Sequence, residues 1–339
     1  MKTALKSVKS RYEIKQIFSE YKDSLELVEE RIKSVLSSDA RKLTDISSYL
    51  LNLGGKRVRP LLCLISADLY NNAGREQQEV IDVAAGIELI HTATLLHDDI
   101  IDKSPTRRGK PTAYLEFGSD ATLLAGDFLF VRAFGICGML DKFTIKSTEA
   151  ACGAVIEGEQ LEGFLEKDID YSMERYLDVI SKKTSALFAL SSKIGAHQVG
   201  ASKEEVEKLN NFGLAAGTAF QIVDDILDIT ANEKTLGKKP GNDLRQSTPT
   251  IINLLWLKKS KAEAQKFFFN EKNESDVLQA MNAIKESGII EEAREMAVDY
   301  TNQAVELLDS LNNTELNKEG QKQKDMLLSI LDFTLERTY

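Results

Sequence analysis

The chain has 339 residues, of which 42% are hydrophobic, enough to build a large buried core in one or two domains. The formal net charge is −10, which argues against nucleic acid as a partner, because proteins that bind it present basic surfaces. Five prolines are few for a chain of this length and favour helices over a β architecture with many turns.

Cysteine usage and sorting signals bear on where the protein works. Cys63, Cys137 and Cys152 lack zinc-ligand spacing and are expected to be buried, reduced side chains. The first residues are mildly basic without an apolar signal core, and no run is expected to be long enough to cross a bilayer. We therefore expect a cytoplasmic protein with no transmembrane segment, in one domain over 1–339 with a loose extension at 1–11.

Hydrophobic residues recur at helical spacing along almost the whole chain, so the predicted fold class is all-α. The run 79–102 is apolar on nearly every side, which is typical of a helix buried in a large core, and 121–140 is similar. A loop is expected over 234–247, and 258–275 has no clear pattern. The other predicted helices cover 12–36, 41–53, 61–70, 147–165, 173–197, 203–230, 251–257 and 326–335.

An acidic motif occurs twice with the same spacing, each time inside an apolar helical run. The copies contain Asp98, Asp99 and Asp102, and Asp224, Asp225 and Asp228. Aspartates four residues apart share a helix face, and their oxygens suit Mg²⁺, which completes its coordination with water and phosphate. One such motif is more often a solvated helix end, but buried carboxylates need a cation, and the second copy favours metal. We predict that all six aspartates bind Mg²⁺, with Mn²⁺ as a substitute.

Basic residues cluster beside these motifs. The clusters are Lys56 and Arg59, Arg107 and Arg108, Lys182 and Lys183 next to Thr184, and Lys238 and Lys239. Each cluster alone is more often a solvated surface pair, whereas together with two metal motifs they predict a site for two diphosphates. His91 lies two helical turns before Asp98 and is either a phosphate donor or a core histidine, and both alternatives stay open. No nucleophilic triad, GxGxxG motif or P-loop occurs.

In their order along the chain, these motifs resemble those of the trans-isoprenyl (polyprenyl) diphosphate synthases, from about residue 12 to the last predicted helix. The motifs are Gly55-Lys56-Arg57-x-Arg59-Pro60, His97-Asp98-Asp99-x-x-Asp102, Arg107-Arg108-Gly109-x-Pro111-Thr112, Lys183-Thr184, Phe220-Gln221-x-x-Asp224-Asp225-x-x-Asp228 and Gly237-Lys238. The resemblance implies an all-α isoprenoid synthase fold with helices around a deep central cavity, usually as a homodimer. It also implies that an allylic diphosphate ionises, condenses with isopentenyl diphosphate and loses a proton.

The resemblance assigns roles to single residues. Asp98 and Asp102 are implied to be the principal ligands of the first metal motif with Asp99 in support, and Asp224 to ligate with help from Asp225 and Asp228. Catalytic roles are implied for Asp98, Asp99, Asp102, Lys183 and Asp224. The residues implied to hold isopentenyl diphosphate are Lys56, Arg59, His91 and Arg108. Those implied to surround the allylic diphosphate are Arg107, Lys183, Thr184, Gln221 and Lys238.

The resemblance also implies that the residues just before the first motif set the length of the product. A bulky aromatic five residues before the first aspartate blocks the tunnel, whereas here that position is Ala93, followed by Thr94. We therefore expect a long-chain synthase of the octaprenyl or heptaprenyl type, which makes quinone side chains and delivers its product to a membrane. Phe128, Phe130 and Phe134 are candidates for a tunnel floor.

Three alternatives remain open. They are a farnesyl or geranylgeranyl synthase, a class I terpene cyclase, and one subunit of a two-component synthase. A cyclase usually replaces the second motif with an Asn/Ser/Glu triad, which is not present at 224–228.

The chain departs from the family pattern at two places. After Asp243-Leu244 the family usually continues with Gly-Lys, where this chain has Ser247-Thr248, so a phosphate-reaching lysine is missing. Glu162 stands where the family often has glutamine. Neither departure touches the aspartates.

Overall fold

The computed structural model describes residues 12–71, 78–165, 171–232 and 239–336. These residues are almost entirely helical, which confirms the predicted all-α class. The strands in the described ranges are the two-residue β1 (Thr106–Arg107) and β2 (Lys110–Pro111), which pair antiparallel directly after the first acidic motif. The prediction of one domain stays a prediction, and residues 1–11 lie outside the described residues.

The helices of the first half are α1 (Ile14–Glu20), α2 (Lys22–Val35), α3 (Arg41–Asn52), α4 (Val58–Asp68), α5 (Gln78–Ile101), α6 (Ala113–Phe117), α7 (Ser119–Cys137) and α8 (Lys142–Leu165). Those of the second half are α9 (Met173–Ile180), the π-helical turn η1 (Ser181–Ser185), α10 (Ala186–Gln198), α11 (Lys203–Thr230), α13 (Asn242–Gln246), α14 (Ile251–Lys259), α15 (Lys261–Phe269), α16 (Glu274–Glu286), α17 (Ile289–Asp309) and α18 (Gly320–Glu336).

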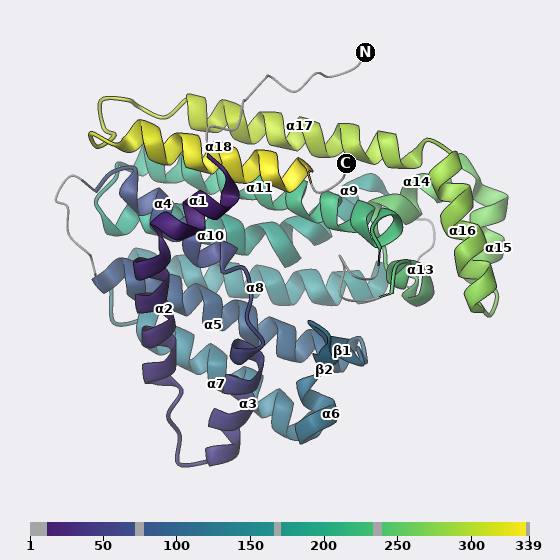
Figure 1. The fold of residues 1–339 in the computed structure, drawn as a ribbon, viewed down its shortest axis with the longest axis horizontal. Helices are drawn as coiled ribbons and strands as arrows, with labels where there is room; N and C mark the ends of the chain where they lie inside the picture. Colours follow the sequence, from purple (N-terminus) through teal and green to yellow (C-terminus); the bar gives the residue numbers. More distant parts are fainter. Residues whose placement is uncertain (1–11, 72–77, 166–170, 233–238, 337–339) are drawn as a thin grey trace.

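The long helices α5, α7, α8, α10 and α11 run lengthwise through the molecule (Figure 1). Helix α5 packs against α4 and α7, and α10 packs between α4 and α11. Helices α17 and α18 cover α11 along one edge, while α15 and α16 stand at one end of the molecule (Figure 1). Both acidic motifs therefore sit on helices that are packed on several sides.

Apolar side chains form two core clusters, and α11 contributes to both. Val206, Leu209 and Phe212 from its first half join the cluster built around α4, α5 and α10. Ile222 and Ile226 from its second half join the cluster around α14, α16 and α17. The helix that carries the second acidic motif is thus held in the core along its whole length.

The structure refines several predicted helices. The predicted helix 12–36 is two helices that meet at Tyr21, whose hydroxyl donates to Asp68 Oδ2 over 2.8 Å. The predicted helix 173–197 contains the π-helical turn η1, which sequence periodicity does not reveal. Part of the predicted loop 234–247 is the short helix α13, and half of the unclear segment 258–275 is α15.

Helix α5 corrects the expectation that no run reaches the length of a membrane span. By length and composition it qualifies as a candidate span, but 72% of its most apolar 18-residue window is buried inside the protein. A central core helix needs apolar residues on every side, which gives it the composition of a membrane helix. Its burial here makes it a core helix.

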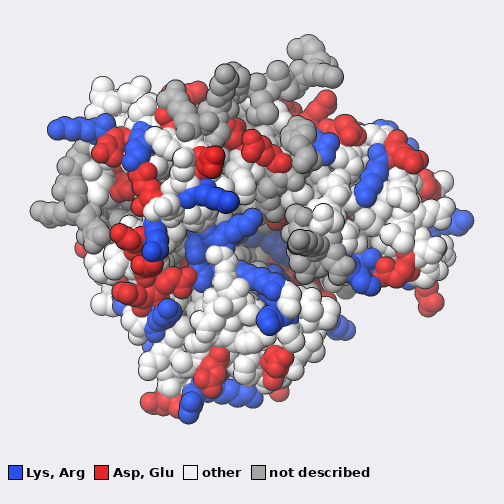
Figure 2. Space-filling model, viewed as in Figure 1, with Lys and Arg blue, Asp and Glu red and all other residues white. Residues whose placement is uncertain are grey.

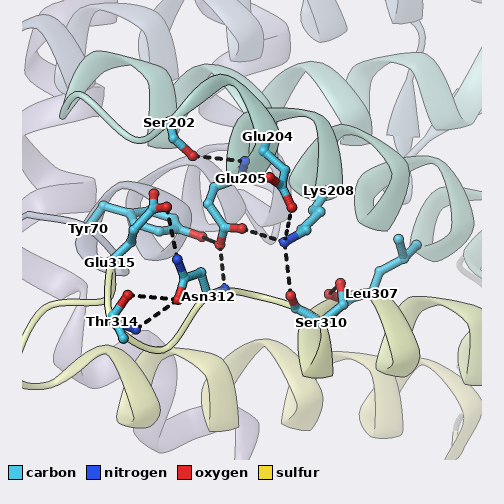
Figure 3. Close-up of polar contacts among 10 residues, drawn as sticks. All are labelled: Tyr70, Ser202, Glu204, Glu205, Lys208, Leu307, Ser310, Asn312, Thr314 and Glu315. Carbon is cyan, nitrogen blue, oxygen red and sulfur yellow. Dashed lines mark hydrogen bonds and ion pairs between the residues drawn. The ribbon is translucent and has the colours of Figure 1, made fainter.

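A buried carboxylate fixes the start of α11 (Figure 3). Glu205 Oε2 accepts hydrogen bonds from the Tyr70 hydroxyl over 2.8 Å and from the Asn312 backbone N–H over 2.9 Å. Glu205 Oε1 accepts from Lys208 Nζ over 2.7 Å, and that ammonium also donates to the Ser310 carbonyl over 3.0 Å. The network ties α11 to the end of α4 and to the connection between α17 and α18.

Candidate functional site

The first acidic motif occupies the C-terminal end of α5 and the turn after it. Asp98 and Asp102 are one helical turn apart, and Asp102 lines a cavity of about 400 Å³. Asp99 is 1% exposed and binds Arg107, with Nη2 to Oδ1 at 2.6 Å and Nε to Oδ1 at 3.0 Å. This pair fastens the β1–β2 hairpin to α5, so the middle aspartate is turned into the protein.

The second acidic motif lies near the end of α11, and its last two aspartates are engaged by the protein. Asp225 accepts hydrogen bonds from Tyr176 hydroxyl over 2.8 Å, from Gln221 Nε2 over 2.9 Å and from the Ile251 N–H over 3.1 Å. Asp228 Oδ2 accepts from the Asp243 N–H over 3.1 Å. Both are buried, whereas Asp224 is half-buried, and its charge, after that of Glu88, partly opposes the lowering of the Arg59 pKa by burial.

Lys183 and Thr184 lie in the π-helical turn η1, where the extra residue changes which side chains face the cavity. The Lys183 ammonium binds Glu159 at 2.7 Å and lies closer still to Glu162. Thr184 Oγ1 donates to Gln221 Oε1 over 2.7 Å. A Cβ at Gly158 would lie 2.6 Å from the backbone nitrogen of Lys183, so glycine is required for α8 to approach this turn.

Carboxylates outnumber cations at this end of the site. Burial raises the pKa of Asp98 to about 8, assisted by Glu159 and Asp102 and opposed by Lys183 and Arg107. Burial also raises the pKa of Asp102 and of Glu162. A divalent cation with oxygen preference fits such a donor set and would relieve its excess negative charge.

In the part of the chain that the structure describes, no three such side chains converge into a ready-made metal cluster. Mg²⁺ commonly uses one or two carboxylates and completes its shell with water and substrate phosphate. The donor set therefore fits a cation that binds together with a diphosphate.

A second cavity, of about 270 Å³, is lined by all four residues predicted to hold isopentenyl diphosphate. They are Lys56, Arg59, His91 and Arg108. Arg59 stacks over the Phe188 ring at 4.9 Å, and burial lowers its pKa to about 10. Burial, followed by Arg59 and Arg108, lowers the pKa of His91 well below its ordinary value, so this imidazole is neutral at pH 7.

Sequence reasoning missed the residues that support this cavity. Arg57 has φ 48° and ψ 37°, the left-handed conformation that side chains rarely adopt. Its guanidinium binds Glu88 Oε1 at 2.8 Å, Glu29 Oε1 at 2.5 Å and the Leu51 carbonyl at 3.1 Å. Arg57 and Glu88 line the cavity together with Lys56 and Arg59. A sequence signal existed in Glu88, an acidic residue inside the apolar run of α5.

The larger cavity brings together most of the residues predicted for the allylic diphosphate. Arg107, Lys183, Thr184 and Gln221 line it, and Lys238 lies outside the described residues. The segment 242–250, which contains the Ser247-Thr248 departure from the family pattern, forms another wall through Asn242, Asp243, Gln246, Thr248, Pro249 and Thr250.

Arg108 lines both cavities, so the two predicted diphosphate sites are adjacent. Figure 2 shows lysine and arginine side chains gathered around a hollow in the middle of one face, although the chain as a whole carries a net charge of −10. Local cations can therefore attract anionic ligands to a protein that is acidic overall.

The residues predicted to set product length lie on α5 next to these cavities but line neither of them. Ala93 is fully buried, and the Thr94 hydroxyl donates to the His91 carbonyl over 2.8 Å. Helix α7, which carries the candidate floor residues, packs directly against α5. Of these residues, Phe128 is covered by the Arg132 guanidinium at 4.6 Å.

A family model described as polyprenyl synthetase matches residues 40–286, which contain both acidic motifs and all the basic clusters. The chain belongs to the polyprenyl synthetase family. This family membership confirms the resemblance inferred from the motifs, and the protein is a prenyltransferase that makes isoprenyl diphosphates.

Known members with different product lengths are similar to this polyprenyl synthetase. A geranylgeranyl diphosphate synthase of Sulfolobus acidocaldarius is 36% identical over 322 residues, covering 91% of this chain and 95% of the relative. An octaprenyl diphosphate synthase of Escherichia coli K12 is 35% identical over 287 residues, covering 82% and 87%.

Solved structures confirm the predicted isoprenoid synthase fold. A polyprenyl synthase of Caulobacter crescentus, complexed with calcium and isoprenyl diphosphate, superimposes with a TM-score of 0.88 at 32% identity, covering 96% of this chain and 98% of that one. A decaprenyl diphosphate synthase of Rhodobacter capsulatus gives a TM-score of 0.87 at 30% identity, covering 96% and 99%.

Proposed function

We propose that this polyprenyl synthetase is a Mg²⁺-dependent enzyme that condenses isopentenyl diphosphate with an allylic diphosphate into a long-chain all-trans-polyprenyl diphosphate. The observation that carries this proposal is the pair of adjacent cavities lined by cationic side chains, the larger of which is also lined by Asp102 of the first acidic motif and Asp225 of the second. Two cavities that share Arg108 suit two diphosphate substrates whose reacting carbons must meet.

The two cavities divide the substrates. The cavity of about 270 Å³ binds isopentenyl diphosphate through Lys56, Arg59 and Arg108, with neutral His91 as a hydrogen-bond donor. The cavity of about 400 Å³ binds the allylic diphosphate through Arg107 and Lys183. Lys238 is proposed to assist from the segment outside the described residues.

We propose that the surroundings of each aspartate decide whether it binds the metal directly. Asp98, Asp102 and Asp224 are the proposed direct ligands. Asp99, Asp225 and Asp228 are proposed to orient them, because these three side chains are buried, whereas Asp98 and Asp224 are half-buried and Asp102 is exposed. When bound, Mg²⁺ or its substitute Mn²⁺ supplies positive charge that stabilises the departing diphosphate.

The proposed reaction needs no protein nucleophile. Lys183 and Arg107 hold the allylic diphosphate while its carbon–oxygen bond breaks and leaves an allylic cation. The double bond of isopentenyl diphosphate, oriented by Lys56 and Arg59, attacks this cation and forms the new carbon–carbon bond. A proton then leaves the adjacent carbon for the released pyrophosphate. Apolar side chains such as Phe188 and Phe220 line the smaller cavity and exclude water, which would quench the cation.

The proposed long product rests on Ala93, because a methyl side chain at this fully buried position of α5 is too small to block a tunnel as an aromatic ring would. A geranylgeranyl synthase is the second candidate, favoured by the similarity to the Sulfolobus enzyme. The measurement that separates them is product analysis after incubation with farnesyl and isopentenyl diphosphates and Mg²⁺. Products longer than twenty carbons are expected. Products that stop at twenty carbons would contradict the long-chain proposal. The absence of any condensation with the metal present would contradict the proposed function itself.

We further propose a homodimer. Large apolar side chains are exposed on the neighbouring helices α7 and α8, a pattern that indicates a protein interface. They are Leu123, Leu124 and Val131 on α7 and Ile156 and Phe164 on α8. We also propose that the enzyme works in the cytoplasm on soluble substrates and delivers its product to a membrane.

A further inference from the structure

The segment after Asp243, which lines the larger cavity, lacks the phosphate-reaching lysine that is usual in the family. Thr248 stands at its position and lines the cavity. Ser247, where the family usually has glycine, adopts φ 59° and ψ 31°. A non-glycine residue in this left-handed conformation persists only where its surroundings hold it.

Lys272 provides that support. It lies between α15 and α16, outside every motif that the sequence analysis assigned. Its ammonium donates to the Leu244 carbonyl over 3.1 Å and makes a short hydrogen bond to Ser247 Oγ. It also sits over the rings of Phe267 and Phe268, at 5.1 and 5.3 Å from their centroids.

These contacts are the natural ones for a cation at a helix end. Leu244 belongs to the last turn of α13, whose carbonyls carry partial negative charge, and an ammonium is favourable there. Ser247 is the residue on which α13 ends, so Lys272 binds both the last turn and its left-handed cap.

Two more contacts hold α13 against α16, which lies beside it (Figure 1). The Arg245 guanidinium makes a bidentate contact with the Glu274 carboxylate, with Nε to Oε1 at 3.1 Å and Nη2 to Oε2 at 2.9 Å. A Cβ at Gly241 would lie 2.7 Å from Met281 Sδ, so the start of α13 also packs tightly on α16. The segment between these anchors supplies Asn242, Gln246 and Thr248 to the cavity.

We propose that Lys272 is a positioning residue for the allylic diphosphate cavity: it locks the Ser247 turn and thereby sets where Gln246 and Thr248 lie. This inference rests on the proposed assignment of that cavity. Lys272 does not line the cavity itself, so it acts through the turn and does not touch the diphosphate.

The test compares Lys272→Met with three matched variants in the Mg²⁺-containing full-length enzyme. Methionine keeps an apolar stem over the two rings but donates no hydrogen bond. Lys272→Arg keeps a cation. Lys266→Met is the control, because Lys266 is an exposed lysine on the adjacent helix α15. The third variant combines Ser247→Gly with Lys272→Met, because glycine adopts a positive φ at position 247 without the contacts from Lys272.

For Lys272→Met we expect KM for farnesyl diphosphate to rise about fivefold while KM for isopentenyl diphosphate stays within about twofold. Lys272→Arg and Lys266→Met should stay within about twofold of wild type, and Ser247→Gly should reduce the Lys272→Met effect to about twofold. A general loss of stability would change both KM values or kcat, and would not be relieved by glycine. An unchanged KM for farnesyl diphosphate, an equal rise in both KM values, or the same rise in Lys266→Met overturns the proposal.

If the wild-type enzyme does not use farnesyl diphosphate, that result contradicts the proposed function but does not test the role of Lys272. Hydrogen exchange then tests the role of Lys272 without substrate. The Thr248 amide donates to the Asp243 carbonyl over 2.9 Å and reports on the turn. Its exchange should become faster in Lys272→Met and remain slow in Lys266→Met. Equal exchange in both variants overturns the lock.

Discussion

The six aspartates of the two motifs have different surroundings despite their identical spacing. Asp99, Asp225 and Asp228 accept hydrogen bonds from arginine, tyrosine, glutamine or backbone groups. Asp102 faces the larger cavity, and Asp98 carries a pKa raised to about 8 by burial, Glu159 and Asp102. Identical spacing therefore does not give the aspartates identical surroundings, and the proposed division into metal ligands and residues that orient them follows these surroundings.

Glu162 offers a test of how Lys183 is shared. In this structure Lys183 binds Glu159 and Glu162, so the proposed contact with the allylic diphosphate requires it to exchange at least one of these carboxylates for a phosphate oxygen. Glu162→Gln removes one competing negative charge and keeps a hydrogen-bond acceptor. We expect KM for the allylic diphosphate to fall about threefold, about what a partly exposed ion pair contributes. Steady-state kinetics against both substrates measure it, and an increase in KM would show that Glu162 assists binding.

Ala93 offers a test of product length. Ala93→Tyr places a ring at a fully buried position of α5, so chains should terminate earlier and the mean product should shorten by at least one five-carbon unit. Thin-layer or mass analysis of the products measures the change, with circular dichroism to confirm an unaltered helical fold. An unchanged length distribution would place the tunnel elsewhere.

Among the helices, α11 links the two ends of the molecule. Its first turns are held by the Glu205 network, and its last turns carry Asp224, Asp225 and Asp228. Since a helix is a stiff rod, whatever fixes its start also limits movement of the aspartates at its other end. The position of the second motif therefore depends on contacts far from the cavity.

Glu205→Ala should destabilise the protein by about 2 kcal/mol, because the Tyr70 hydroxyl and the Asn312 N–H lose their buried acceptor. The neighbouring Glu204 is exposed and serves as the matched control; Glu204→Ala should change the free energy of unfolding by less than about 0.5 kcal/mol. Urea unfolding measures both. Similar values for the two variants would mean that the network does not stabilise α11.

The same residue predicts a pH dependence. Burial raises the pKa of Glu205, but hydrogen bonds from Lys208, Asn312 and Tyr70 outweigh it and hold the pKa below its ordinary value. The stability from this carboxylate is therefore fully present above its unfolded-state pKa of about 4.3, and is lost as the pH falls through its lower folded-state pKa. The stability difference between wild type and Glu205→Ala should shrink over that acidic range, as unfolding curves at several pH values would show. A difference that grows toward low pH would contradict this sign.

At the scale of the whole molecule, charge and apolar surface are distributed for different purposes. The net charge of −10 is compatible with anionic substrates because cations gather at the cavities (Figure 2). The exposed apolar side chains of α7 and α8 lie on helices that pack against each other, as expected of a surface that a second copy covers.

Val131→Glu tests the proposed dimer. Val131 is 67% exposed, and in a symmetric interface the new charge is introduced from both subunits, so the dissociation constant should rise at least about 100-fold. Leu278→Glu is the control, since Leu278 is 56% exposed on α16, away from that surface. Sedimentation velocity measures both. A wild-type monomer, or dimers that persist in Val131→Glu, would contradict the proposed interface.

Local sequence was sufficient for the helices, the acidic motifs and most of the basic residues, because helical periodicity and motif spacing depend on residues a few positions apart. The structure brings Lys56, Arg59, His91 and Arg108 to one cavity, as the motifs predicted. Family membership, read from the same motifs, is confirmed.

Long-range contacts decided the rest. Asp225 is oriented by Tyr176, 49 residues away, and by Ile251, 26 residues away, and nothing in the spacing of the motif distinguishes it from Asp224. Lys272 reaches Leu244 across 28 residues from a segment whose sequence showed no clear pattern. Such partners meet only when helices pack, so the hydrogen bonds of Asp225 and the contacts of Lys272 with α13 are properties of the tertiary structure.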